Sequence, residues 1–123
     1  MSDDARQHLG RLGEQLATEH LVRLGYEIVE RNYRTRWGEL DIVAFDGRRV
    51  LAFCEVKTRR VGWAEPFDAL HSRKRAKVRR MAGSWLAERT DRPFAPVVRF
   101  DAIGVIVDAG GGLVSVEHLE GAF

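Results

Sequence analysis

The chain has 123 residues, of which 45% are hydrophobic and 31% charged, with a formal net charge of +2 and a pI near 9.0. This length and composition predict one globular domain, residues 1–123, built around a single hydrophobic core. No apolar run approaches the ~20 residues of a membrane-spanning helix, and the acidic start at Met1–Asp4 is unlike a signal peptide. The single Cys54 cannot form an internal disulfide. We therefore expect a cytoplasmic protein without membrane association.

The first predicted helix covers residues 5–24. Ser2 or Asp3 is a suitable N-cap, and Gly25 is a residue type that commonly ends a helix. Apolar residues recur every three or four positions, as in a helix with one buried face. This stripe consists of Ala5, Leu9, Leu12 and Leu16.

Glu14 lies off the apolar stripe, on the same helix face as Gly10, Ala17 and Leu21. The small side chains on this face would let another element approach closely and would direct Glu14 inward. The alternative is a solvent-facing glutamate, which is a good helix former.

Tyr26–Arg31 is expected to be a short strand at a sheet edge, where charged side chains are tolerated. Residues 32–37 form a basic, aromatic stretch that we expect to be a loop. Arg36 and Trp37 in this stretch could contact phosphates or stack on unpaired bases. Alternatively, Trp37 folds back onto the core.

A β-hairpin is predicted over the next segment. Two apolar runs, Leu40–Phe45 and Val50–Val56, flank the dipeptide Asp46-Gly47, which is a strong short-range hairpin signal. The two runs therefore predict neighbouring antiparallel strands.

Charged side chains interrupt these runs at Asp41, Glu55 and Lys57. A desolvated carboxylate is costly unless it pairs or holds a cation. Two carboxylates can hold Mg²⁺, which activates water for phosphodiester hydrolysis, and an adjacent ammonium stabilises developing negative charge. From these residues alone, a hydrolytic site and an edge hairpin with surface ion pairs remain equal alternatives. Glu39 would assist from the same face as Asp41, cap the preceding loop or pair with Arg36.

The hairpin register tests the metal-site interpretation. A two-residue turn would set Asp41 opposite Ala52 and would place Asp41 and Glu55 on opposite faces of the sheet. Both can hold one metal ion only if the loop has an odd number of residues or a bulge shifts the pairing. We predict such a shift between Phe45 and Phe53.

Residues 58–67 are expected to form a loop, because glycine and proline interrupt the segment. Arg59 and Arg60 directly follow the predicted strand and are well placed to meet a phosphate backbone. Trp63 either lines a nucleic-acid groove or packs under the next helix.

The second predicted helix covers residues 70–89. Its apolar residues again recur at helical spacing and predict one buried face. They are Val78, Met81, Ala82, Trp85 and Leu86.

The opposite face of this helix is basic. Six of the ten residues from His71 to Arg80 are lysine or arginine, and Arg73, Lys77 and Arg80 project together. Such a face attracts phosphates without sequence preference, although charged helix faces are usually only solvated. The scarcity of acidic residues favours nucleic acid. Lys74 lies on the apolar side and could point toward the hairpin.

The last predicted elements are a strand at Val97–Val107, a turn at Gly110–Gly112 and a short strand at Leu113–Val116. Arg99 and Asp101 share one strand face, and we expect them to form a structural ion pair near the site. The order of elements indicates an α/β sandwich with a mixed sheet and a parallel crossover between its central strands.

Four segments, in order, resemble the YraN family of uncharacterised bacterial proteins. The segment from Asp41 to Lys57 resembles the Asp…Glu-x-Lys signature of the restriction-endonuclease-like PD-(D/E)xK nuclease superfamily, and the family is similar to archaeal Holliday-junction resolvases. The likeness extends from about Leu9 to Val107. The four segments are Gly13-Glu14, Gly38–Val43, Glu55–Arg59 and Arg99–Asp101.

This resemblance implies a restriction-endonuclease-like α/β/α sandwich with a mixed central sheet. It implies a Mg²⁺- or Mn²⁺-dependent DNA endonuclease that acts on branched repair or recombination intermediates. Asp41 and Glu55 would then be metal ligands, joined by the carbonyl of Val56 and assisted by Glu14. Lys57 would position the attacking water.

The expected partner is nucleic acid, and the resemblance favours DNA over RNA. A homodimer with two-fold symmetry would suit the cutting of two strands. The alternatives are a nucleic-acid-binding module that keeps the fold without catalysis, and a structural protein whose charges only form ion pairs. The expected nucleic-acid contacts are Arg36, Arg59, Arg60, Arg73, Lys74, Lys77 and Arg80.

Overall fold

A computed structural model of the chain describes residues 2–62 and 72–123, with the backbone alone at 72–74. The described residues form two helices and five strands. In chain order they are α1 (Asp3–Arg23), β1 (Glu27–Thr35), β2 (Gly38–Phe45), β3 (Val50–Arg60), α2 (Ser72–Glu88), β4 (Val97–Val107) and β5 (Leu113–Leu119).

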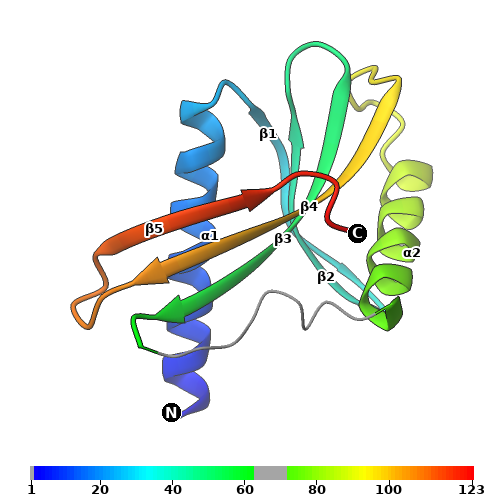
Figure 1. Ribbon diagram of the computed structural model, residues 1–123. Coiled ribbons are helices and arrows are strands. Elements are labelled where there is room, and N and C mark those ends of the chain that lie inside the picture. The colour runs from blue at the N-terminus through cyan, green and yellow to red at the C-terminus, as the bar shows by residue number, and fades with distance from the viewer. Residues whose placement is uncertain (1, 63–71) are drawn as a thin grey trace.

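The strands form one sheet in the order β1-β2-β3-β4-β5, in which only the β3–β4 pair is parallel. Figure 1 shows α1 on one face of this sheet and α2 on the other. Each face has its own hydrophobic cluster, with α1 contributing to one and α2 to the other. The predicted α/β sandwich with a mixed central sheet is therefore confirmed.

Helix α1 begins and ends as the sequence indicated. Ser2 Oγ accepts a hydrogen bond from the Ala5 N–H at 3.1 Å and caps the helix. Gly25 follows the helix with a φ of 95°, which is a left-handed conformation that glycine adopts without strain.

The face of α1 that carries Glu14 packs most closely on the sheet. Gly13, Ala17 and Leu21 are the buried residues of the helix. A Cβ atom added at Gly13 would lie 1.6 Å from Thr58 Oγ1 on β3, a distance that no pair of non-bonded atoms can adopt. The close approach predicted for this face is therefore confirmed, and it depends on glycine at this position.

Strand β1 is longer than the Tyr26–Arg31 strand that the sequence predicted, and it is an edge strand as expected. Residues 32–35, expected in a loop, continue the pairing with β2, and the chain turns only at residues 36 and 37. Solvated charges along an edge strand concealed the alternation that identifies a strand. Asn32 interrupts its regular geometry with a left-handed φ of 54°.

The pairing of β2 with β3 has the register that we predicted for a metal site with ligands from both strands. Phe45 lies opposite Leu51, and Ile42 lies opposite Cys54. An odd number of residues, 46–50, therefore separates the paired ends, as predicted. The two-residue turn is excluded.

Asp46 stabilises the hairpin turn with its side chain. Its Oδ1 accepts hydrogen bonds from the N–H groups of Arg48, Arg49 and Val50 at 2.8, 2.9 and 2.9 Å. Gly47 within the turn has a φ of 83°. The Asp-Gly signal correctly predicted a hairpin, but the aspartate closes a longer loop than the usual two-residue turn.

Strand β3 continues beyond the predicted end at Val56 and includes Thr58, Arg59 and Arg60, which the sequence placed in a loop. Every residue of β3 has a parallel partner on β4, so backbone pairing extends the strand past its apolar run. The predicted parallel crossover is confirmed. Strand β5 is also longer than the predicted segment 113–116.

Helix α2 lies within the predicted range 70–89, of which residues 70 and 71 are outside the described part of the chain. Its predicted apolar stripe is confirmed, because Val78, Met81, Ala82 and Trp85 are buried against the sheet. Among the described residues, no helix is both long and apolar enough to span a bilayer.

Candidate metal centre

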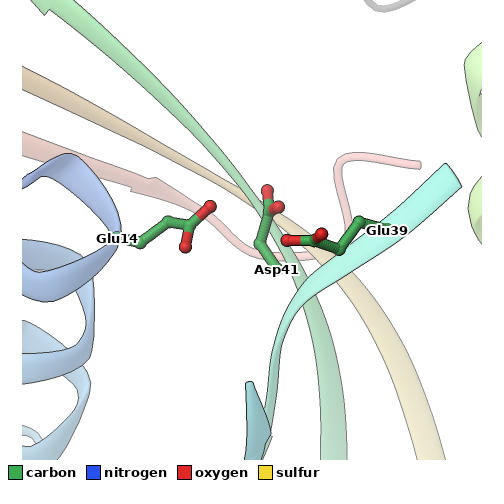
Figure 2. Close-up of side chains that lie close together, drawn as sticks. All are labelled: Glu14, Glu39 and Asp41. Carbon is green, nitrogen blue, oxygen red and sulfur yellow. The ribbon is translucent and has the colours of Figure 1, made fainter. Parts of the chain in front are cut away.

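Three carboxylates meet between α1 and β2. Glu14 comes from α1, and Glu39 and Asp41 come from β2. One oxygen of each side chain lies within 4.8 Å of the corresponding oxygens of the other two. Figure 2 shows Glu14 and Glu39 approaching Asp41 from opposite sides. Oxygen donors at this separation suit a hard divalent cation, and without one their like charges repel.

Asp41 has the most perturbed carboxyl group of the three. Burial, followed by the negative charge of Glu55, raises its pKa to about 8. A hydrogen bond of 2.7 Å from the Val56 N–H to Oδ2 opposes this rise, whereas Glu14 and Glu39 add to it. Asp41 is therefore largely protonated at neutral pH unless a cation replaces the proton.

Glu14 lies in the same partly buried, negatively charged surroundings as Asp41. Burial and then the charge of Glu39 raise its pKa, while Arg31 and a hydrogen bond with the Asp41 carboxyl group oppose the rise. Burial and like charge therefore disfavour the ionised form of Glu14, as they do for Asp41.

Asn32 connects two members of the group from the neighbouring strand. With its amide nitrogen facing the carboxylates, Asn32 donates hydrogen bonds of 2.7 Å to Glu39 Oε1 and 2.7 Å to Glu14 Oε2. Arg34 forms an ion pair with Glu39, with 3.6 Å between Nε and Oε2. Glu39 thus pairs with Arg34 rather than with Arg36, and it joins the carboxylate group directly.

The remaining predicted site residues lie on β3. Glu55 is close enough for its charge to raise the pKa of Asp41, but it does not belong to the group of three carboxylates. Val56 meets Asp41 through its N–H, and the role of its carbonyl as a ligand, which the family resemblance implies, stays a prediction. Lys57 is exposed on the same strand.

The predicted phosphate-binding arginines of β3 are half-buried. Arg60 Nη1 donates to the carbonyl of Ala109 in the β4–β5 turn at 3.5 Å. Arg59 precedes it on the strand. Both arginines therefore lie on the sheet rather than in the loop that was expected.

The predicted basic residues of α2 are described only in part. Lys77 and Arg80 are exposed on the helix. Arg36 is exposed in the turn between β1 and β2. Three residues that the sequence singled out have side chains outside the described residues: Trp63, Arg73 and Lys74.

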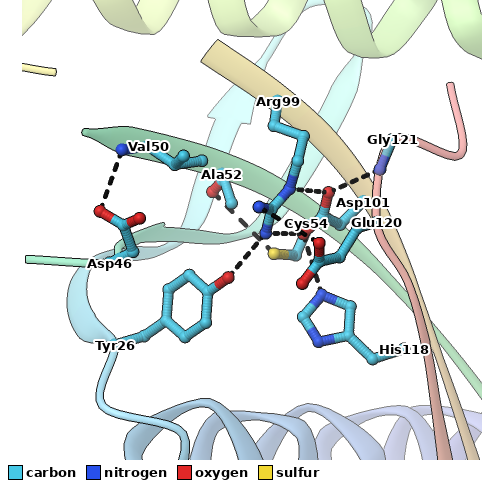
Figure 3. Close-up of polar contacts among 10 residues, drawn as sticks. All are labelled: Tyr26, Asp46, Val50, Ala52, Cys54, Arg99, Asp101, His118, Glu120 and Gly121. Atoms are coloured by element: carbon cyan, nitrogen blue, oxygen red, sulfur yellow. Dashed lines mark hydrogen bonds and ion pairs between the residues drawn. The ribbon is translucent and has the colours of Figure 1, made fainter. Parts of the chain in front are cut away.

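The predicted ion pair on β4 is present (Figure 3). Arg99 donates from Nε and Nη2 to the two oxygens of Asp101 at 2.8 and 2.7 Å, and also donates to the Tyr26 hydroxyl. His118 Nε2 and the Gly121 N–H reach the same carboxylate at 2.9 and 3.0 Å. Burial favours protonation, but the hydrogen bonds from His118 and Arg99 prevail and lower the pKa of Asp101 to about 2.

The fold and this site define a mixed α/β sandwich protein with a carboxylate cluster between its first helix and its central hairpin. A family model described as the uncharacterised protein family UPF0102 matches residues 13–105, a range that includes all three clustered carboxylates. The chain belongs to the UPF0102 family, which confirms the family membership that the four motif segments indicated.

Curated relatives match over nearly their whole length. A UPF0102 protein of Frankia alni is 47% identical over 126 residues, covering 100% of both chains. A UPF0102 protein of Acidothermus cellulolyticus is 45% identical over 128 residues, covering 97% of this chain and 96% of the relative. A UPF0102 protein of Streptomyces griseus is 46% identical over 119 residues, covering 96% and 98%.

Proposed function

We propose that this protein is a divalent-metal-dependent DNA endonuclease of the restriction-endonuclease-like PD-(D/E)xK type. The observation that supports the proposal is the meeting of Glu14, Glu39 and Asp41 at one point. A protein that used Asp41 only for stability would pair it with a cationic side chain, as it does for Asp101. Instead, the neighbours of Asp41 are other carboxylates.

The donor set fits Mg²⁺ or Mn²⁺, because it consists of carboxylate oxygens close enough to share one ion. When bound, such an ion neutralises charge on a phosphoryl oxygen and makes a bound water more acidic. Asp41, Glu14 and Glu39 would hold the ion, and Asn32 would orient the latter two.

Residues on β3 would complete the chemistry. The Val56 N–H fixes the orientation of Asp41. The charge of Glu55 adds negative potential at the same point, which favours a cation there and makes Glu55 the next candidate ligand. Lys57, exposed two residues further along the strand, would place its ammonium beside the attacking water or the developing phosphoryl charge.

Substrate binding would use the basic residues that the sequence singled out. Lys77 and Arg80 are exposed on α2 and suit phosphate contacts without sequence preference. Arg59 and Arg60 extend β3 beyond Lys57. We propose branched repair or recombination DNA as the substrate and a homodimer as the form that cuts two strands.

The test combines metal binding with cleavage. Mn²⁺ or Mg²⁺ should raise the melting temperature of the wild type and support cleavage of labelled junction, flap or duplex DNA. Glu14→Gln and Asp41→Asn should abolish both effects. Glu19→Gln, on the exposed side of α1, is the matched control and should retain both. Cleavage by Asp41→Asn at the wild-type rate would refute the proposal.

A second candidate function is a nucleic-acid-binding module without catalysis. The exposed lysine and arginine on α2, Lys77 and Arg80, favour it independently of the carboxylates. This function predicts DNA binding in EDTA, a steep loss of affinity with salt, and no cleavage with either metal. Substitution of Lys77 would then weaken binding, while substitution of Asp41 would leave binding unchanged.

A further inference from the structure

The β1–β2 hairpin ends in a turn formed by Arg36 and Trp37. The guanidinium carbon of Arg36 lies over the Trp37 ring, 4.6 Å from its centroid, which is a cation–π contact. Arg36 is exposed, whereas Trp37 is half-buried and packs against the hydrophobic cluster under α2. The turn therefore presents a planar cation on an aromatic ring that is anchored to the core.

Thr35 holds this turn in one conformation. Its hydroxyl accepts a hydrogen bond from the Trp37 N–H at 3.1 Å and donates to the Gly38 carbonyl at 2.9 Å. Thr35 and Gly38 also pair across the hairpin. A partner that stacks on the turn would therefore lose little affinity to ordering it.

The turn is close in the chain to the carboxylate group, and the hairpin that carries it has two exposed arginines, Arg34 and Arg36. Trp37 is two residues from Glu39, a separation of at most about 7 Å along the chain. Arg34 on the same hairpin has a side chain that is 89% exposed, and it contacts Glu39. Exposed guanidinium and aromatic planes within a basic surface are the groups on which proteins stack unpaired bases.

We infer that the Arg36–Trp37 turn stacks an unpaired nucleobase, so that the preferred substrate is DNA with a single-stranded segment next to the cleaved phosphate. A base inside an intact duplex already stacks on both neighbours and has no free face, whereas an unpaired base has an accessible face. The position of cleavage in this inference rests on the proposed nuclease function. Base stacking itself does not.

The experiment measures binding in EDTA, which separates stacking from catalysis. Fluorescence anisotropy would compare a labelled blunt duplex, the same duplex with a thymine overhang, and the same overhang made of abasic nucleotides. We expect the wild type to bind the thymine overhang ~10-fold more tightly than either of the other two substrates. Thermal unfolding would confirm that every variant is folded.

Variants at Arg36 separate stacking from charge. Arg36→Ala should remove most of the overhang preference, and Arg36→Lys should remove it equally, because lysine keeps the charge but not the plane. Arg34→Ala is the matched control on the same hairpin. It should weaken binding to blunt and overhang DNA by the same factor.

Three results would overturn the inference: equal binding of all three substrates by the wild type, full preference in Arg36→Lys, or tight binding of the abasic overhang. Cleavage with Mg²⁺ or Mn²⁺ is measured separately on the thymine-overhang substrate. An overhang preference without metal-dependent cleavage would support base stacking and refute the nuclease function.

Discussion

Two aspartates of the same sheet have opposite environments. Asp101 on β4 has no exposed surface and receives hydrogen bonds from Arg99, His118 and a backbone N–H. Asp41 on β2 is half-buried among carboxylates. The pKa of Asp101 falls to about 2, and the pKa of Asp41 rises to about 8.

The difference contrasts a buried charge that the chain pairs within its own structure with one that, in the proposed function, binds a metal ion. Asp101 is neutralised by groups of the chain itself, which makes the pair part of the folded structure. Asp41 is neutralised by a proton that a cation can replace. Carboxyl groups with strongly raised pKa values are candidates for functional sites for this reason.

Removal of the charge at Asp101 should have the largest effect on stability. Asp101→Asn leaves Arg99, whose side chain is only 19% exposed, without its carboxylate, and the expected loss is ~3–5 kcal/mol in the free energy of unfolding. Because the folded pKa is lowered, the wild type holds the part of this stability that depends on ionisation, on the order of 2 kcal/mol, above pH ~4 and loses it as pH falls toward 2. Urea unfolding at neutral and acidic pH measures both effects. A loss below ~1 kcal/mol at neutral pH would contradict the structural role.

Replacement of Asp41 by asparagine should have the opposite effect on the free energy of unfolding and stabilise the protein. The folded pKa is raised from 3.8 to about 8, so the wild type loses stability as pH rises between these values, while asparagine does not titrate. We expect Asp41→Asn to be more stable than the wild type by on the order of 2 kcal/mol at pH 8.5 in EDTA. The advantage should shrink toward pH 4. A variant that is less stable at pH 8.5 would refute the contrast between the two aspartates.

The environment of Asp41 also depends on how closely α1 packs against the sheet. Gly13→Ala forces a Cβ against Thr58, so we expect a loss of ~1–3 kcal/mol in stability and a weaker rise in melting temperature with Mn²⁺. Gly10→Ala is the matched control on the same helix, because a Cβ there meets nothing within 4 Å. The control should gain up to ~1 kcal/mol from helix propensity. Equal stability of the two variants would show that α1 does not need the close contact.

The smallest effect on stability is expected for a substitution of His20, which lies beside His118, a hydrogen-bond partner of Asp101. Its ring lies 5.7 Å from that of His118, and burial, then His118 and Arg23, lower its pKa. A lowered folded pKa means that stability present above pH 6.5 is lost as pH falls below it. His20→Gln should reduce the stability that is lost on acidification by less than ~0.5 kcal/mol. Thermal unfolding at pH 5.5 and 7.5 measures it, with the exposed His8→Gln as control.

The fold and the two aspartates could be inferred from sequence to different extents. Apolar periodicity identified both helices and the central strands, and the charges at Asp41 and Glu55 predicted the odd loop in the hairpin. The edge strand was too short in the prediction, because residues 32–35 are mostly polar and contain a single buried residue, Tyr33, so they show no apolar alternation. Asn32 was missed as a neighbour of the carboxylates because only cross-strand geometry brings it to Glu39 and Glu14.

Glu39 was considered an assisting group, and its place in the cluster could not be derived from the chain pattern. Strand alternation put Glu39 and Asp41 on one face, but their distance from Glu14 depends on how closely α1 packs. That distance is set by Gly13 and Thr58, two residues whose contact leaves no periodic signal. The Arg99–Asp101 pair, by contrast, was predictable because both residues lie on one strand.

The parallel pairing of β3 with β4 has a consequence for folding kinetics. It joins residues 47 positions apart, such as Val50 and Val97, whereas the β2–β3 hairpin closes locally through Asp46. Long-range parallel pairing forms slowly, because the chain loses loop entropy before it gains contacts. The hairpin should therefore form early, and the docking of α1 that brings Glu14 to Asp41 should follow. At pH 8.5 in EDTA, where Asp41 is ionised, carboxylate repulsion then acts after the transition state, so that Asp41→Asn slows unfolding and leaves the folding rate nearly unchanged.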